Sequence, residues 1–227
     1  MKSKALASAA AAALLIATAA VPASAHVNVI PGVSATGSST QALTAGQSGT
    51  LFFRVGHGCT FAYNLNNPAT NTSFKGTKWG TSSFSVDIPV IAQGTGTTLP
   101  KPQWVPGWSS KVVKNATTGV YTITWTAKSQ DFWIADGPEG DTGATQFADF
   151  GVNVKWAPTA GGQTVFFMAV QTCPVLIPGV KKTSTTKAIA PKTIYIYNSW
   201  DVTDGSGADQ VLDDTEHNTA PSVKVLP

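Results

Sequence analysis

The stretch SFSVDIPV at residues 83–90 alternates between apolar and polar side chains, and it decides the fold class. One phase holds Phe84, Val86, Ile88 and Val90, and the other holds Ser83, Ser85 and Asp87. A period of two is typical of a β-strand that buries one face and exposes the other. The stretch therefore predicts a half-buried strand at residues 83–90.

The same pattern recurs along the chain. YTITWT at residues 121–126 and FGVNVKW at 150–156 alternate cleanly, LFFRV at 51–55 alternates less cleanly, and VFFMAV at 165–170 is apolar on both faces, as in a central strand. Clusters rich in Gly, Pro, Asn and Thr separate these stretches, for example at 94–106 and 157–162. No stretch shows the period of a long amphipathic helix. We therefore expect an all-β sandwich or barrel.

The first 25 residues have the features of an export signal. Lys2 and Lys4 precede a small and apolar run at residues 5–20, and ASA at 23–25 is a signal-peptidase pattern. The apolar run is short for a membrane span, and no second run of that length follows. We expect cleavage after Ala25, a secreted or extracytoplasmic mature chain that starts at His26, and no membrane span in that chain.

The size and charge of the mature chain restrict its partners. Removing residues 1–25 from 227 leaves 202, which fits one domain, and we place it at residues 26–204 with a polar and acidic tail at 205–227. Lys2 and Lys4 leave with the signal, so the formal charge falls from +3 to +1. Such a small charge gives no field to attract nucleic acid, and we expect no nucleic-acid partner.

The chain has two cysteines, Cys59 and Cys173. In an oxidising compartment, a pair of cysteines favours one disulfide. The alternative makes Cys59 a soft metal ligand beside His57 in the run HGC at residues 57–59. The two interpretations exclude each other, because a disulfide sulfur is a poor ligand. We predict the disulfide.

His26 is the strongest candidate for metal binding, because cleavage after Ala25 would free an α-amine on a residue that also carries an imidazole. The amine nitrogen and the ring Nδ1 can chelate one ion, and both can lose their protons near neutral pH. Nitrogen donors in a tetragonal arrangement favour Cu(II). The alternative is that His26 is an ordinary first residue. His57 and His217 are predicted as a structural and a solvated histidine, and the absence of a His-x-x-x-His spacing disfavours a zinc hydrolase.

Aromatic and acidic residues offer weaker candidates. Trp125 and Trp156 lie on apolar phases and are predicted in the core. Three other tryptophans lie in turn-rich stretches, where they could contact sugars or pack within loops: Trp79, Trp104 and Trp108. Three carboxylates in a Gly-rich loop could form an acid/base pair but fit a solvated turn better: Asp136, Glu139 and Asp141. No serine-hydrolase, Walker or dinucleotide-binding motif is present.

A series of short motifs, in order along the mature chain, resembles the YcnI-like family of bacterial copper-binding proteins. The motifs are AHVNV at residues 25–29, FRVGHGC at 53–59, SVDIP at 85–89, PGW at 106–108, ITW at 123–125, FADFG at 147–151, AVQTC at 169–173, Trp200 and the segment 217–223. The resemblance implies a single cupredoxin-like or immunoglobulin-like β-sandwich that holds Cu(II) outside the membrane for copper homeostasis. Its partners would be copper and other copper-handling proteins.

The resemblance also implies a ligand set of an N-terminal histidine brace, a strand carboxylate and a tryptophan. The brace corresponds to His26 and the tryptophan to Trp200. Ser85 stands where the family has a glutamate, and Asp87 follows two residues later. The third donor is therefore open between Asp87, Asp201, His57 and water.

Three classes of function follow. The first is a non-enzymatic copper carrier or buffer, which we prefer. The second is a copper-dependent polysaccharide monooxygenase, for which His57 would complete a three-nitrogen site. The third is a metal-independent adhesion or glycan-binding module, in which His26 has no role.

Overall fold

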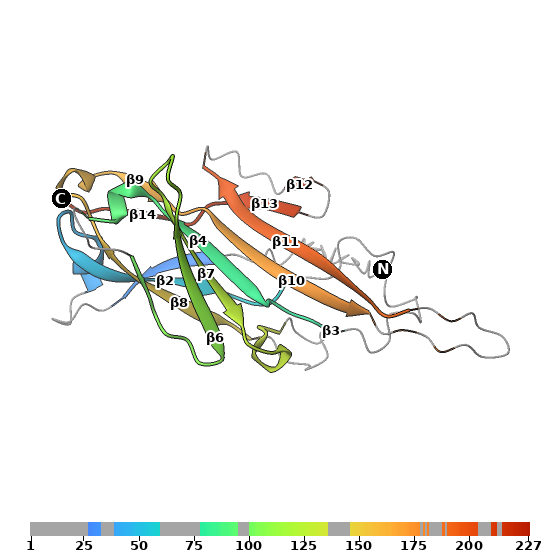
Figure 1. Cartoon of the computed structure of the whole chain (residues 1–227). Helices are drawn as coiled ribbons and strands as arrows, with labels where there is room; N and C mark the ends of the chain where they lie inside the picture. The colour runs from blue at the N-terminus through green and yellow to red at the C-terminus, as the bar shows by residue number, and fades with distance from the viewer. Residues whose placement is uncertain are drawn as a thin grey trace, which may run out of the picture.

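The computed structural model describes residues 27–32, 39–59, 78–94, 100–135, 146–177, 179, 181, 188, 190–203, 210–212 and 215–227. Within these ranges, the regular elements are β-strands and short 3-10 turns (Figure 1). The turns are η1 (Ser39–Leu43), η4 (Val90–Ala92), η5 (Gln130–Phe132) and η6 (Pro158–Ala160). The predicted all-β fold class is confirmed.

Two sheets and a small ribbon make up this part of the chain. The larger sheet has eight strands among the described residues, in the order β12-β13-β11-β10-β4-β7-β6, with β3 also paired to β10. Its strands are β3 (Lys78–Trp79), β4 (Ser83–Ile88), β6 (Trp108–Lys114), β7 (Tyr121–Ala127), β10 (Ala169–Ile177), β11 (Lys192–Val202), β12 (Gln210–Leu212) and β13 (Thr215–Thr219). The smaller sheet has the order β1-β2-β8-β5, from β1 (Val27–Pro31), β2 (Ser48–Val55), β5 (Lys101–Pro102) and β8 (Ala148–Lys155). The ribbon pairs β9 (Thr164–Phe166) with β14 (Ser222–Lys224).

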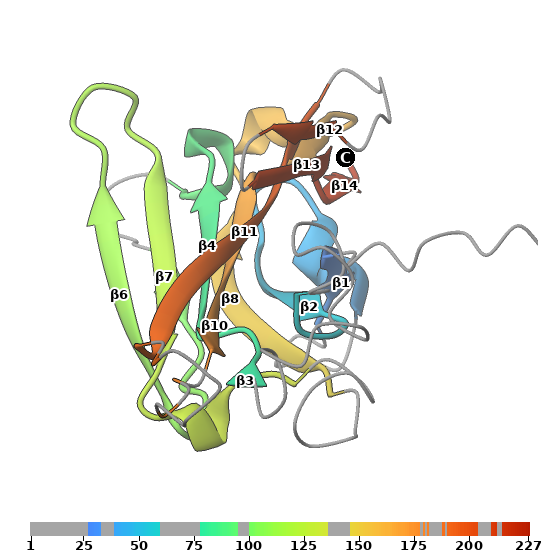
Figure 2. The ribbon, with the colours of Figure 1, turned by 90° about the vertical axis from the view of Figure 1, so that its right-hand side faces the viewer.

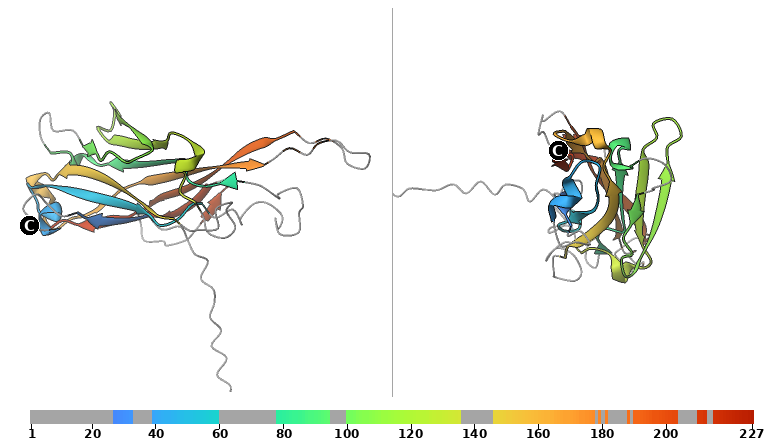
Figure 3. Two further views of the ribbon diagram at one scale, coloured as in Figure 1. Left: turned by 90° about the horizontal axis from the view of Figure 1, so that it is seen from below. Right: turned by 90° about the vertical axis from the view of Figure 1, so that its left-hand side faces the viewer.

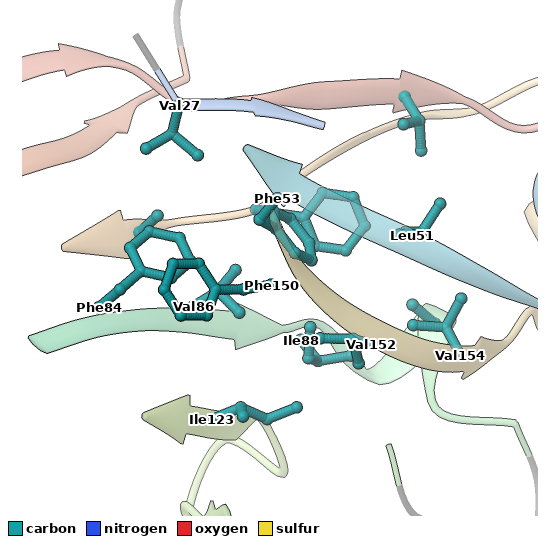
Figure 4. Packing of buried hydrophobic residues seen from close by; sticks show 14 of the residues in the cluster. Val27, Leu51, Phe53, Phe84, Val86, Ile88, Ile123, Phe150, Val152 and Val154 are labelled. Carbon is teal, nitrogen blue, oxygen red and sulfur yellow. The ribbon is translucent and has the colours of Figure 1, made fainter. Parts of the chain in front are cut away.

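The two sheets pack face to face and form a β-sandwich (Figure 2). The core lies between them, where the apolar phases of β2 and β8 meet those of β4 and β7 (Figure 4). Phe84 of the larger sheet contacts Phe150 of the smaller sheet, with ring centroids 5.0 Å apart. Trp125 and Trp156 are buried in this core, as predicted from their phases.

A left-handed turn precedes β6 and explains the PGW motif. Gly107 has φ 78°, and an added Cβ would lie 2.0 Å from a ring carbon of Phe132, so no other residue fits without rearrangement. The turn leads into Trp108, which is buried and packs edge-on against Phe150 at 5.1 Å. Trp104, before the turn, is 75 % exposed, so the two tryptophans do not form one packed cluster.

The apolar stretch at residues 165–170 is not one central strand. Val165 belongs to β9, which pairs with β14, whereas Ala169 begins β10 in the larger sheet. Between them Phe167 is buried and Met168 is 48 % exposed. The single-strand prediction is therefore wrong: the chain passes from the ribbon to the larger sheet within this stretch.

The described part of the C-terminal segment forms strands. Residues 210–212 and 215–219 add β12 and β13 to the larger sheet, and 222–224 form β14. The apolar residues Ala220, Val223 and Val225 are buried. Burial of these apolar side chains holds the segment against the core, although its overall composition is polar.

β10 and β11 form a long hairpin that projects beyond the rest of the larger sheet (Figure 3). The pairing runs from Ala169 opposite Trp200 to Ile177 opposite Lys192. Among the described residues, no helix has the length and apolar character needed to cross a membrane.

Candidate functional site

The start of β1 fixes where the predicted mature N-terminus would be attached. Val27 pairs with Val55 of β2 and is only 4 % exposed, so it is anchored in both the sheet and the core (Figure 4). His26 and the predicted cleavage site lie outside the described residues, and His26 is bonded directly to Val27. Beyond Val55 the chain continues into Gly56 and His57. The first strand of the mature chain thus begins at the end of the ladder where β2 leads into His57.

The His57 ring has a defined tautomer. Its Nδ1 lies 2.6 Å from the carbonyl oxygen of Gly58. A carbonyl oxygen can only accept a hydrogen bond, so Nδ1 carries the proton. In the neutral imidazole the lone pair is then on Nε2, the nitrogen that could coordinate a metal. Metal-binding histidines commonly donate their other ring N–H to a backbone carbonyl in this way.

Gln171 ties the His57 segment to the larger sheet. Its side chain is fully buried, and Nε2 donates to the carbonyl oxygen of His57 at 2.9 Å and to the hydroxyl of Thr81. Its Oε1 has no hydrogen-bond partner among the described residues. Sequence analysis did not identify this residue. The available signal was a polar residue on the buried phase of β10, between Ala169 and Cys173.

A disulfide joins the same two regions. Cys59 and Cys173 are bonded, fully buried and 114 residues apart, with their Cα atoms 6.0 Å apart. Neither cysteine of the chain is free. The predicted disulfide is therefore present, and Cys59 is not a thiolate ligand. Together, the disulfide and Gln171 fix residues 57–59 against β10.

Trp200 lies on the core face of the larger sheet. It pairs with Ala169 of β10 and with Asn218 of β13, and its side chain is 1 % exposed. Its Nε1 has no hydrogen-bond partner in the part of the chain that the structure describes. Because residues two apart in a strand share a face, Trp200 is on the same face as Asn198, which pairs with Gln171.

Asp87 lies on the opposite face. Its neighbour Val86 is buried and pairs with Ala169, in the row that contains Trp200, so Asp87 points outward. Its carboxylate accepts a hydrogen bond from the hydroxyl of Thr122 at 2.6 Å. One ion could not contact the side chains of both Asp87 and Trp200, and Ser85 shares the outer face with Asp87.

His217 makes a salt-bridge contact with Asp201 instead of being only solvated, and the contact is an ion pair only when the imidazole is protonated. Its Nδ1 lies 2.9 Å from both carboxylate oxygens of Asp201, and the two side chains are 30 % and 34 % exposed. The pairing of β13 with β11 places His217 beside Ser199, on the outer face. The sequence could not show this contact, because it depends on the parallel pairing of two segments at the end of the chain.

A second ion pair lies on the outer face of the smaller sheet. The guanidinium of Arg54 donates two hydrogen bonds of 2.7 Å to Asp149 and lies over the ring of Phe147. The hydrogen bond to Asp149 raises the pKa of Arg54 above its ordinary value. These groups are exposed, and they support the pairing of β2 with β8.

The remaining candidates are three carboxylates and Trp79. Asp136, Glu139 and Asp141 lie outside the described residues. Trp79 is half-buried and pairs with Val175 at the far part of β10. Within the described ranges, no group of three or more His, Cys, Asp or Glu side chains could hold a metal ion.

The chain is thus an all-β sandwich with a disulfide that joins the segment after β2 to β10. No protein-family model matches it, and no curated protein is similar in sequence. Among solved structures, it is similar to an uncharacterized protein from Nocardia farcinica, whose crystal structure is described as revealing an immunoglobulin-like fold. The TM-score is 0.45 with 18 % identity, over 82 % of this chain and 93 % of that chain. This likeness is too distant to support an argument about the site.

Proposed function

We propose that the mature chain is a non-enzymatic extracytoplasmic protein that binds one Cu(II) ion at its N-terminus and carries or buffers copper. The observation that supports this most is the state of His57. Its Nδ1 donates to Gly58, so its Nε2 holds the lone pair, and it follows directly after the strand that pairs with Val27. With the α-amine and Nδ1 of His26, His57 would supply a third nitrogen donor.

The donor set differs from the set that the family resemblance implies. The outward position of Asp87 disfavours it as a ligand together with Trp200, and we propose His57 in its place. Trp200 remains compatible, because its indole is buried and its Nε1 has no partner among the described residues. The disulfide is consistent with an oxidising compartment outside the cytoplasm.

The test is a Cu(II) titration of protein that begins at His26, beside a copy with one extra N-terminal residue. The first copy should bind one equivalent, with coupling to three nitrogens in its EPR spectrum, and the second should lose the site. His57→Ala should lose one nitrogen coupling. His217→Ala is the matched control, because His217 pairs with Asp201 elsewhere and should not affect binding. Equal binding by the first two copies would refute the proposal.

A copper-dependent polysaccharide monooxygenase is the second candidate, and the same His57 tautomer supports it, since that chemistry uses a three-nitrogen site. It would need copper, a reductant and an oxygen-derived oxidant. Release of oxidised oligosaccharides from chitin or cellulose by the copper-loaded protein, lost in His57→Ala, would favour this candidate over a carrier. Their absence, with copper still bound, would favour the carrier.

A further inference from the structure

The outer face of the larger sheet carries aligned rows of hydroxyl side chains. The strand register places two rows side by side across β6, β7, β4, β10 and β11. The first row is Ser109, Thr126, Ser83, Thr172 and Tyr197, and the second is Lys111, Thr124, Ser85, Val170 and Ser199. We call these two rows the hydroxyl face. Neighbouring strands lie about 4.8 Å apart, so the hydroxyls form a regular two-dimensional array.

Several hydroxyls of this face make no hydrogen bond within the described part of the protein, so a ligand could replace the solvent around them. Within the part of the chain that the structure describes, no hydrogen bond engages the hydroxyls of Ser85, Thr124, Thr126 or Thr172. Ser83 donates to the carbonyl oxygen of Trp125 and Ser109 to that of Thr126, so their oxygens can still accept. The face can therefore both donate and accept hydrogen bonds.

The face also combines low charge with exposed aromatic rings. Lys111 is the charged residue within the two rows, and Asp87 and Asp201 lie beyond them, near the ends of β4 and β11. Tyr197 is 39 % exposed, and Tyr195, two residues earlier on the same face of β11, is 51 % exposed. Soluble proteins usually cover such a face with charged residues, and this chain does not.

We propose that the hydroxyl face, with Tyr195 and Tyr197, binds a neutral β-1,4-linked polysaccharide. Such a polymer is an extended ribbon with hydroxyls along its edges and C–H groups on its faces. Ser85 and Thr124 would exchange hydrogen bonds with sugar hydroxyls, and the tyrosine rings would pack against the sugar faces as rigid amphipathic groups. The low charge disfavours nucleic acid and anionic polymers. This site lies on the opposite face of the sheet from Trp200, and it does not depend on the proposed copper function.

Retention of the mature, metal-free protein on insoluble chitin and cellulose tests the proposal. The protein should be retained on at least one of them and eluted by the soluble hexasaccharide of the same sugar. The double variant Ser85→Ala/Thr124→Val should weaken binding about tenfold, and Tyr197→Leu by a similar factor. Thr50→Val is the matched control. Thr50 also points outward, but from the smaller sheet, and its loss should leave retention unchanged.

Circular dichroism and thermal unfolding would show whether each variant keeps the fold. If a variant unfolds, binding can instead be measured on the intact protein, in which the hexasaccharide should quench or shift the tyrosine fluorescence. No retention on either polysaccharide would overturn the proposal. Equal retention by all folded variants would also overturn it. A dimer in solution that buries Tyr197 and persists with the hexasaccharide would show that a second copy covers this face instead.

Discussion

The two halves of the core are built from different chemistry. Beneath β4, β7 and β8, four aromatic side chains pack with ring centroids 5.0–6.1 Å apart: Phe84, Trp108, Trp125 and Phe150. We call this the aromatic half. Beneath β10 and β11, the buried side chains include Gln171, Asn198 and Trp200 beside the Cys59–Cys173 disulfide. We call this the polar half.

The difference shows how each half is stabilised. Burial of apolar rings stabilises the aromatic half directly. Buried polar atoms destabilise unless they are hydrogen-bonded, and both Gln171 Oε1 and Trp200 Nε1 are without a partner among the described residues. The Cys59–Cys173 disulfide stabilises the polar half instead.

The largest expected effect comes from removing the disulfide of the polar half. Cys59→Ala/Cys173→Ala should lower the free energy of unfolding by about 5 kcal/mol, because the bond closes a loop across a separation of 114 residues. Urea denaturation of the variant, and of the intact protein with and without reductant, measures this. Copper affinity should also fall. An unchanged midpoint would contradict the view that the polar half depends on this bond.

Phe150→Ala should lower the free energy of unfolding by about 4 kcal/mol, because it leaves a cavity in the aromatic half. The same denaturation experiment measures the loss. Copper affinity should not change under conditions in which the variant is folded. A parallel loss of copper affinity would show that the two halves are not independent.

Two buried glutamines allow a matched comparison. Gln171→Met and Gln93→Met should each destabilise by about 2 kcal/mol, because each leaves two acceptors without their donor. Only Gln171→Met should lower copper affinity, by about tenfold, since Gln171 holds the backbone of His57. Calorimetric titration of both variants decides this. Equal copper affinities of the two variants would show that Gln171 does not influence the proposed site.

The smallest expected effect is a difference in the free energy of unfolding between variants of two equally buried tryptophans. Trp125 donates its Nε1 hydrogen to the carbonyl oxygen of Gln103 at 3.2 Å, whereas Nε1 of Trp200 has no partner among the described residues. Trp125→Phe should therefore cost about 1 kcal/mol more than Trp200→Phe in metal-free protein. Equal costs in thermal unfolding would mean that Trp200 has a partner in solution.

The sequence predicted the aromatic half well. Period-two alternation located β4 and β7 and most of β8, because each has one buried and one solvated face. It failed at residues 165–170, where continuous apolar character could not distinguish one strand from a passage between two sheets. The strands of the C-terminal segment could not be located from the sequence, since their pairing depends on partners far away in the chain.

The site was harder to predict. Cys59 and Cys173 were paired correctly because no other cysteine exists. Asp87 and Trp200 seemed compatible as ligands until the register placed them on opposite faces of one sheet. Gln171 was missed because the sequence shows only a polar residue on the buried phase of β10, and not the distant carbonyl to which its side chain donates. The copper ligands themselves remain predictions.

The position of the disulfide has a consequence for the order of events in the cell. The bond connects the segment after β2 to β10, so it can close only after the chain has been synthesised through Cys173 and these two regions have come together under oxidising conditions. Under the copper proposal and the predicted export, the α-amine of His26 also becomes available only when the leader is cut. On that route, both conditions are met only after translocation. A newly made chain in the cytosol would then be unable to compete for the copper there, and its metal-binding state would report that export is complete.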